Sequence, residues 1–560
     1  MTAVRRFFSI LVVSLAAAAA LAQQPSTATP RTEPVSAETD KDIENPRALR
    51  LSLDEAVRTT MERNLGISIQ RYDYKMAGES LVEQYGLYDW YTSGLLSASS
   101  TAFPTSNSLQ TASQRSVVAN AGVAQTLPTG GNYSFNFNNT RANKAGFGTL
   151  INPSYSSDFG VSISQPLMRN FGLDVTNRNI NIARNTLGIN KELFRSVLMN
   201  TAVSVEQAYL DLVYARRNVD VVKDSLFLAR DQSRITQIRI DVGASAPLDI
   251  LQPRVQIATT EEQLIAAVAS VRDAEDRLRA LLNLPQEEWN RPIVPTDNVA
   301  YTPMTIDTDQ AVAQALTLRP ELRENSLTTQ TRKIQYLYAR NQVLPKLDAF
   351  VDYGAAGVAG RALAADSQGQ PTGLTSSNYP HALRQIVSGD FPSWSVGVNV
   401  GVPILNIGAR AEARRAKLDY EQSKASEDQT KQVIVTDVRK AVRDIDFAAK
   451  EIVASRTARD AAEQNLDAER KRYENGMTTN FNVLQIQQQL SDARVRELQA
   501  LVGYNKAVAN YHRAVGDLLD VRNIKVEDDT PDEPKLFGRA FDRYGWLNYE
   551  HRLKAEDAAK

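Results

Sequence analysis

Few residues in this chain have the types and spacing that catalysis or metal binding requires. The 560 residues include no cysteine, and the three histidines lie far apart, at His381, His512 and His551. The absence of cysteine excludes disulfides, thiolate metal sites and a cysteine nucleophile, and scattered histidines argue against a histidine metal site or triad. The nearest approach to a nucleophile motif, Gly243-Ala244-Ser245, has no histidine close to it in sequence. We therefore expect no enzyme activity, no metal site and no cofactor.

The charge balance gives no sign of a nucleic-acid partner. The chain has 64 Lys and Arg residues against 65 Asp and Glu residues, a net charge of −1. No basic stripe with interleaved aromatic residues is found along the sequence, so no nucleic-acid binding is expected. The function must therefore depend on the helices, strands and repeats of the chain.

The N-terminus has the organisation of a secretory signal peptide. Arg5 and Arg6 precede an apolar run, residues 7–21, which ends in Ala20-Leu21-Ala22. This pattern predicts cleavage after Ala22, and a flexible linker rich in Ser, Thr and Pro should follow over residues 23–50. No later segment approaches the ~20 apolar residues that a spanning helix needs. Such an exported chain is periplasmic, secreted or part of an outer-membrane barrel.

The rest of the chain reads as two copies of one plan. Leu53-Asp54-Glu55-Ala56-Val57 matches Thr308-Asp309-Gln310-Ala311-Val312, and RIDVGASAPLDILQ, residues 239–252, matches RYENGMTTNFNVLQ, residues 472–485, without a gap. A duplication is the simplest explanation, and it gives a first repeat over residues 51–295 and a second over 296–525. The remaining residues, 526–560, form a C-terminal tail.

Each repeat contains a run long enough for an unusually long helix. From Ala409 to Asn475 there is no proline or glycine, and from Thr176 to Asp241 only Gly188 interrupts. Helices of about 65 residues would extend about 100 Å and need a packed seam to be stable. An apolar series typical of a coiled coil follows the second run: Leu501, Tyr504, Val508, Tyr511, Val515 and Leu518. We expect a helical hairpin in each half, turned at Gly243 or Gly476, because glycine permits a left-handed residue at a helix end.

Two short stretches alternate in polarity with the period of a β-strand. VGVNVGVPI, residues 396–404, is closed by Pro403, and FGVSISQPL, residues 159–167, is closed by Pro166. Their polar faces hold Gly, Ser and Asn without charge, which suits a water-filled lumen. Strands of about 9–11 residues also have the length that crosses a bilayer when tilted.

The number of strands decides how such a barrel closes. A minimal set per chain has four strands, at residues 90–100, 157–165, 346–354 and 394–402. Bacterial barrels need about eight strands, and open strand edges are not tolerated in lipid. We therefore expect several chains to share one barrel, with Pro166 and Pro403 at the points where strands turn into helices. A further hairpin at residues 116–140 either extends outside the cell or adds strands to the barrel.

From Leu51 to about Val521 the chain resembles the TolC-like outer-membrane efflux protein family. The matching features are LSLDEAV with its second copy DTDQAV, the strand ends QPL and VPI, and the tips VGASAPLDILQ and NGMTTNFNVLQ. The resemblance implies an α+β fold in which antiparallel coiled-coil hairpins form a periplasmic tunnel. About four transmembrane strands per chain would contribute to a twelve-stranded barrel of a homotrimer in the bacterial outer membrane.

The resemblance also implies a function and partners. The chain would be the passive duct of a tripartite efflux or type I secretion system, exporting small toxic molecules or polypeptides. Its implied partners are a periplasmic membrane-fusion adaptor, an inner-membrane pump or ABC transporter reached through that adaptor, and outer-membrane lipid.

The resemblance assigns two roles to the hairpin tips. The adaptor-contacting residues would be Val242, Gly243, Ala244, Asn475, Gly476 and Met477. The tunnel constriction would involve Asp249, Tyr473, Thr478, Asn482 and Gln485. Thr478 stands where family members usually have an arginine latch partner, and Asn482 and Gln485 stand where the best-studied members have an aspartate ring. The latch must therefore differ here, and strong cation selectivity at the tip is not expected.

Alternatives remain open at each level. Asp249 is either part of the closing network or an ordinary acidic residue at a helix N-terminus, and Tyr473 is either a latch residue or a packing residue. The tail over residues 526–560 either packs around the tunnel or is loose. A periplasmic trimeric coiled-coil structural or adhesion protein without a pore is the alternative function, although it predicts charged strand faces.

Overall fold

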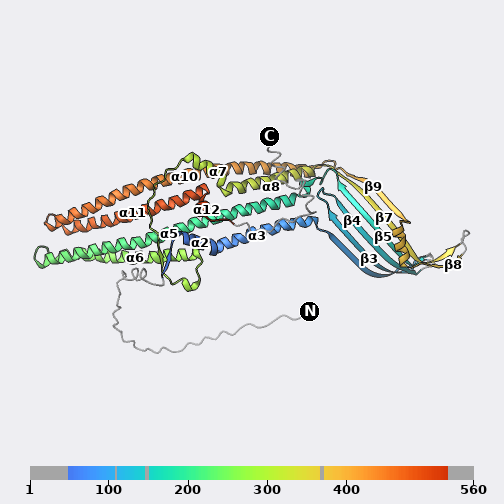
Figure 1. Cartoon of the computed structure of the whole chain (residues 1–560), viewed down its shortest axis with the longest axis horizontal. Helices are drawn as coiled ribbons and strands as arrows, with labels where there is room; N and C mark the ends of the chain where they lie inside the picture. Colours follow the sequence, from blue (N-terminus) through green and yellow to red (C-terminus); the bar gives the residue numbers. More distant parts are fainter. Residues whose placement is uncertain (1–47, 107–109, 146–150, 366–370, 527–560) are drawn as a thin grey trace, which may run out of the picture.

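The computed structural model describes residues 48–106, 110–145, 151–365 and 371–526. The expected signal peptide, the linker up to residue 47 and the tail from residue 527 lie outside the described residues. In the described part, long helices run side by side from two hairpin tips to a strongly curved sheet at the other end (Figure 1).

The first half contains β1 (Leu49–Leu51), α2 (Leu53–Arg63), α3 (Leu65–Tyr85), the short 3-10 helix η1 (Gly86–Tyr88), β2 (Tyr91–Ala102), β3 (Ser113–Thr126), β4 (Asn132–Ala145), β5 (Ile151–Pro166), α4 (Leu173–Thr176), α5 (Arg178–Asp241), η2 (Pro247–Ile250), α6 (Leu251–Leu282), η3 (Gln286–Glu288) and β6 (Ile293–Pro295). The second half contains α7 (Thr308–Leu318), α8 (Pro320–Gln342), β7 (Lys346–Ala365), β8 (Pro371–Ser376), α9 (Tyr379–Ser388), β9 (Pro392–Gly401), α10 (Ile407–Glu474), α11 (Asn480–Val515) and α12 (Leu518–Val521).

The repeated opening motifs begin helices α2 and α7. At α2, Ser52 and Glu55 form a capping box, in which the Ser52 hydroxyl accepts from the Glu55 N–H and the Glu55 carboxylate accepts from the Ser52 N–H. At α7, the Asp307 carboxylate accepts from the N–H groups of Asp309 and Gln310. Both caps satisfy backbone donors that a helix N-terminus leaves unpaired.

The long helices form one layer four helices wide. Next to the sheet the order across the layer is α3, α5, α8 and α10, and near the tips it is α6, α5, α11 and α10. Helices α5 and α10 run the whole length, as their glycine-poor sequences predict.

Apolar seams hold this layer together. One core contains Tyr209, Leu212 and Leu278 between α5 and α6, and another contains Tyr504 and Tyr511 of the predicted coiled-coil series in α11. The Tyr209 hydroxyl donates to the Leu51 carbonyl oxygen (3.1 Å) and so ties β1 to α5. Burial raises the pKa of Tyr209 to about 12, which keeps its hydroxyl protonated at neutral pH.

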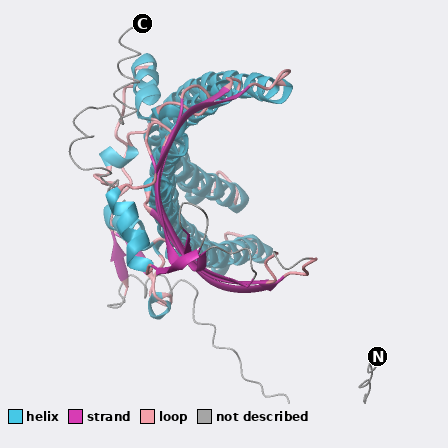
Figure 2. Ribbon diagram, turned by 90° about the vertical axis from the view of Figure 1, so that its right-hand side faces the viewer, coloured by secondary structure: helices cyan, strands magenta, loops and turns pink. Residues whose placement is uncertain are grey.

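The sheet has seven strands and is antiparallel throughout. Its order is β2-β3-β4-β5-β7, after which β8 pairs with the far end of β7 and β9 pairs with the end nearer the helices. The sheet is therefore six strands wide where it meets the helices. Figure 2 shows it from the end as an open arc.

The expected number of about four strands per chain is wrong for this sheet. The four expected strands correspond to β2, β5, β7 and β9, and the hairpin at residues 116–140 is inserted between β2 and β5 as β3 and β4. The hairpin joins the sheet because β3 matches β2 and β4 over their full lengths, from Ala102↔Ser113 to Thr126↔Asn132. Several strands also extend further than expected, and β7 reaches Ala365.

Candidate functional site

The two hairpin tips have the same local structure. Helix α5 ends with Val242 at its C-cap and Gly243 at φ +74°, and α10 ends with Asn475 at its C-cap and Gly476 at φ +71°. The N–H of the next residue returns to the helix in both cases, from Ala244 to the Arg239 carbonyl (2.7 Å) and from Met477 to the Arg472 carbonyl (2.9 Å). These bonds satisfy carbonyl groups that the helix end leaves unpaired, and the positive φ explains the glycine in each copy.

All six expected adaptor-contacting residues are exposed at these tips: Val242, Gly243, Ala244, Asn475, Gly476 and Met477. Two of the exposed side chains are large and apolar, since Val242 is 72% exposed and Met477 is 77% exposed. Leu248, in the turn that follows the first tip, is 74% exposed. Exposed apolar side chains at both tips are candidates for a surface that docks a partner.

Arg239 joins the two tips and was not among the expected site residues. Its Nη1 donates to the Tyr473 carbonyl oxygen (2.7 Å), and its guanidinium carbon lies 4.7 Å from the centroid of the Tyr473 ring. The Tyr473 side chain is buried. A hydrogen bond and a cation–π contact between the same two residues therefore connect α5 to α10.

The other expected constriction residues divide between the two tips. Asp249 accepts from the Ala246 N–H (3.1 Å) and so caps the turn of its own hairpin. In the second tip, the Asn482 amide donates to the Thr478 hydroxyl (3.0 Å), and Thr478 donates to the Glu469 carboxylate (2.5 Å). Gln485 is exposed on α11. The structure thus brings Thr478 and Asn482 together, and it joins Tyr473 to the first hairpin through Arg239.

The sheet has one apolar and one polar face. Strand register places Val351 of β7 and Ile163 of β5 on the same face as Val396 of β9, and it places Asp352 and Ser395 on the other. On β7 the apolar-face residues Val351 and Tyr353 are exposed, whereas Asp352 and Gly354 between them are half-buried, which makes the apolar face the convex side of the arc. An apolar outer face and a polar inner face are what a membrane barrel with a watery lumen requires.

Helix α9 covers part of the outer face at the end of the sheet far from the helices. Ala382 of α9 is fully buried against β7, where Ala355 and Ala359 are also buried. A Cβ added to Gly357 would lie 2.0 Å from the Ala382 carbonyl oxygen, so this glycine is needed for the close approach.

The two prolines expected between strands and helices lie at the end of the sheet nearer the helices. Strand β5 ends at Pro166, and β9 ends at Gly401, two residues before Pro403.

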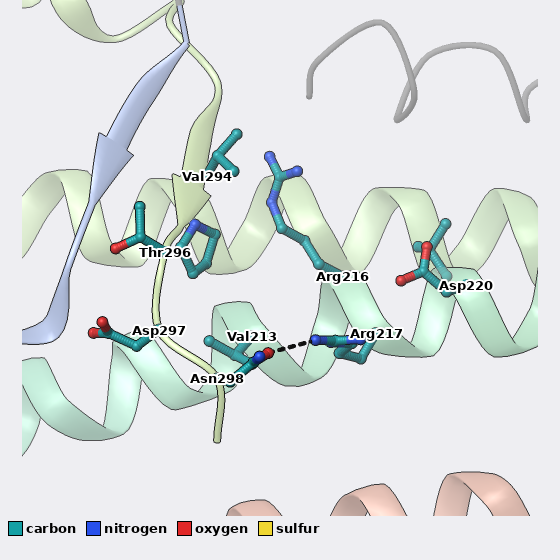
Figure 3. A pocket seen from close by; sticks show the side chains of 10 residues that line it. Val213, Arg216, Arg217, Asp220, Val294, Thr296, Asp297 and Asn298 are labelled. Carbon is teal, nitrogen blue, oxygen red and sulfur yellow. Dashed lines mark hydrogen bonds between the residues drawn. The ribbon is translucent and has the colours of Figure 1, made fainter. Parts of the chain in front are cut away.

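A cavity of about 210 Å³, lined by both apolar and charged side chains, lies where the loop after β6 crosses α5 (Figure 3). In its lining, Arg217 donates to the Asn298 side-chain oxygen (2.8 Å), and Arg216 pairs with Glu275 of α6 (2.8 Å). Asp297 accepts from the Leu53 N–H (2.6 Å). These contacts fasten the loop and the start of α2 to the hairpin, and we assign no ligand to the cavity.

The described residues offer neither a metal site nor a helix that could span a membrane. Within residues 48–526, outside the three internal gaps, no group of three or more His, Asp or Glu residues is placed to hold a metal ion. In the same part of the chain, no helix is long and apolar enough to cross a membrane.

A curved sheet with an apolar outer face, continued by a layer of helices with exposed tips, defines a protein of the tunnel-and-barrel class. The sequence profile described as outer membrane efflux protein matches residues 108–284 and 311–517. The chain therefore belongs to the outer membrane efflux protein family, the TolC-like channels, and it lies in the bacterial outer membrane with its helical tunnel in the periplasm.

Known proteins similar to this chain include both efflux and secretion proteins. The outer membrane efflux protein BepC of Brucella suis is 24% identical over 380 residues, which cover 67% of this chain and 75% of BepC. The alkaline protease secretion protein AprF of Pseudomonas aeruginosa is 23% identical over 359 residues, which cover 61% of this chain and 68% of AprF. Among solved structures, the outer-membrane channel OprN has the same fold, with a TM-score of 0.59 at 17% identity over 85% of this chain and 91% of OprN.

Proposed function

We propose that this chain is the passive duct of a tripartite efflux or type I secretion system, assembled from three copies. The observation that carries the proposal is the continuous surface from barrel to tips. The polar inner face of the sheet continues into a layer of long helices whose far ends expose apolar groups for a partner. The chain itself would catalyse nothing, and the energy for export would come from the inner-membrane component.

The exposed tips are the proposed docking site of a periplasmic membrane-fusion adaptor. That adaptor would connect the duct to an inner-membrane pump or ABC transporter, and outer-membrane lipid would surround the convex face of the sheet. Both tips present an apolar side chain beside a glycine turn, Val242 in one and Met477 in the other, so each copy offers two similar docking points.

The cargo is either a small toxic molecule or a polypeptide. Similarity to BepC, an efflux protein, and to AprF, a protease secretion protein, supports both classes equally. The polar inner face of the sheet carries mainly small Ser and Asn side chains, which recognise little, together with the carboxylates of Asp158, Asp348 and Asp352. We infer that selection of the cargo lies with the inner-membrane component.

A pore-forming assay separates this function from the alternative of a structural or adhesion protein without a pore. The full-length exported protein, extracted from outer membranes, is added to a planar lipid bilayer. A duct gives stepwise increases in ion conductance of uniform size. If folded oligomers insert and conduct no ions, even after disruption of the Arg239–Tyr473 contact, the structural protein is the better account.

A further inference from the structure

The sheet of one chain ends in two edges that have no partner strand within the described residues. There β2 pairs only with β3, and β9 pairs with β7 and with no other strand. About half of the backbone N–H and C=O groups of each edge strand are therefore unpaired. An unpaired backbone group is strongly unfavourable in hydrocarbon, so these edges must be covered in the membrane.

Neither edge has the features that protect a free strand edge. The sequences YTSGLLSASSTA of β2 and PSWSVGVNVG of β9 contain no charged residue, and β9 has its one proline at its first position. Free edges in natural proteins usually carry lysine, internal proline, bulges or other protection against strand pairing. The exposed apolar side chains at both edges, among them Leu96 and Val398, also favour pairing within a membrane.

The two edges run in opposite directions, which allows them to pair with each other between copies. Because all six strands across the sheet are antiparallel neighbours, an even number of strands places β2 and β9 in opposite senses. When β9 of one copy meets β2 of the next, the junction is antiparallel like every other pair in the sheet. A chain with an odd number of strands would not close in this way.

Each edge strand of the sheet is joined along the chain to a helix at the corresponding edge of the helix layer. Strand β2 follows α3, at one edge of the layer, and β9 leads into α10, at the other edge. The neighbour that places its β2 beside β9 therefore places its α3 and α6 beside α10. One contact between copies closes the barrel and the tunnel together.

The inserted hairpin also makes the barrel as wide as the tunnel. Six strands about 4.8 Å apart and tilted by about 40° occupy about 38 Å of circumference. Four helices about 9 Å apart occupy about 36 Å. Four strands would occupy only about 25 Å, so a barrel without β3 and β4 would have to narrow above the helices.

We propose that three copies close an eighteen-stranded barrel, in which β9 of each copy pairs with β2 of the next and the β3–β4 hairpin supplies a third of the wall. This inference rests on the trimer of the proposed function, since two copies would give twelve strands. The barrel would have a backbone diameter of about 36 Å, against about 24 Å for twelve strands of the same tilt. A lumen of this width would admit folded secondary structure as well as small molecules.

Cysteine cross-linking tests the contact between copies, because the natural chain has no cysteine. Leu96→Cys, on the outer face of β2, is combined in separate variants with Val396→Cys, Val398→Cys or Val400→Cys, on the outer face of β9. Oxidation in outer membranes should link at least one combination into species of two and three chains and no larger, seen on denaturing gels without reductant. Leu95→Cys with the same β9 cysteines is the matched control and should not cross-link, because Leu95 lies on the inner face.

Removal of the hairpin tests the strand count. Deleting residues 113–144 joins Ala112 to Ala145, which already lie side by side, since the Ala112 N–H donates to the Ala145 carbonyl (2.7 Å). The trimer of this variant should have a barrel about two-thirds as wide as that of the parent protein, measured by electron microscopy in lipid nanodiscs. An unchanged barrel width would overturn the inference.

The outcomes separate this inference from the function on which it rests. Trimers that export cargo but never cross-link between β2 and β9 would refute the edge pairing and leave the duct intact. Cross-linked species that stop at two chains would refute both the eighteen strands and the trimer. Loss of conductance and of trimers in the parent protein would instead refute the proposed function.

Discussion

At the scale of single residues, Arg239 is the clearest candidate for the contact that holds the tips together. Its paired contacts to Tyr473 connect the two hairpins of one chain. We expect that opening of the tunnel at the tips moves these hairpins apart, in which case the contact would be made only in the closed state.

Arg239→Gln should therefore favour the open duct. Loss of the charged hydrogen bond and the cation–π contact removes about 2 kcal/mol, which shifts the equilibrium between closed and open tips roughly thirtyfold. In planar bilayers the variant should spend more time in a state of larger conductance. Arg234→Gln, which removes an exposed pair with Asp231 on the same helix, is the control and should behave like the parent. Equal conductance of the two variants would show that Arg239 is not a latch.

Asp249 has two possible roles that one substitution separates. Its carboxylate caps the Ala246 N–H, and an asparagine side chain can accept the same bond without the charge. If the negative charge of Asp249 helps to keep the tip closed, Asp249→Asn and Asp249→Ala should both raise the conductance. If Asp249→Asn leaves the conductance unchanged and Asp249→Ala changes it, Asp249 acts only as a helix cap.

Glu275 is fully buried and holds three arginines in place. Its carboxylate pairs with Arg216 (2.8 Å), Arg279 (3.0 Å) and Arg272 (3.2 Å), of which the Arg279 side chain is only 5% exposed. Glu275→Gln removes the carboxylate charge that pairs with the largely buried Arg216 and one of the two carboxylates that pair with Arg279, so it should destabilise the first hairpin by about 3 kcal/mol. The thermal unfolding midpoint should fall, whereas Glu261→Gln, which breaks a half-exposed pair with Arg230, should change stability by less than about 1 kcal/mol. Equal shifts for the two variants would contradict this account.

The sequence predicts some of these residue roles and misses others for physical reasons. Gly243 and Gly476 could be placed in the tips because a helix that ends in a left-handed residue favours glycine. Arg239 was missed because its partner lies 234 positions away, although it begins the repeated tip motif at the position that Arg472 occupies in the second copy. Glu275 interrupts an apolar series, and the sequence alone does not show that Arg216 reaches it from another helix.

At the scale of elements, the two glycine turns are the parts that a partner would contact. Gly243→Val should strain the turn by roughly 1–2 kcal/mol, because a β-branched residue is disfavoured at φ +74°. Apart from the adjacent residues of the chain, nothing lies within 4 Å of a Cβ added at Gly243, so the strain should stay within the turn. We therefore expect oligomers to assemble normally while adaptor binding and export are lost.

Gly503→Val is the matched control for this prediction. Gly503 lies within helix α11, has an ordinary helical backbone and also has open space around an added Cβ. Adaptor capture from solubilised membranes should fail for Gly243→Val and persist for Gly503→Val. Unchanged capture by Gly243→Val would remove the tip from the docking surface.

The elements themselves were predicted unevenly. Helices α5 and α10 followed from long runs almost free of glycine and proline, and β9 followed from its strict alternation of valine with small residues. The predicted number of strands was too low because β3 and β4 place polar residues such as Asn139 and Arg141 on the outer face. These residues weaken the alternation of apolar and polar side chains by which a strand is recognised in the sequence. Membership of the sheet was decided by pairing between strands, which depends on residues distant in sequence.

At the scale of the whole molecule, the proposed duct accounts for the open edges of a single chain. Within the described residues, its sheet and its helix layer both end in unpaired edges on the same two sides. In the proposed assembly, neighbouring copies would cover these edges, lipid would surround the apolar outer face of the sheet, and an adaptor would bind the exposed tips. The duplication inferred from the sequence remains an interpretation, but it accounts for two similar hairpins side by side in one layer.

The measurement that tests the central claim most directly is the detergent-corrected mass of the native protein extracted from outer membranes. The account predicts a particle of three mature chains, because three copies form the proposed duct and its eighteen-stranded barrel. A dimer would close a barrel of twelve strands and contradict the trimer. A monomer would contradict the shared barrel itself, because six strands are fewer than the eight or so that bacterial barrels need to close.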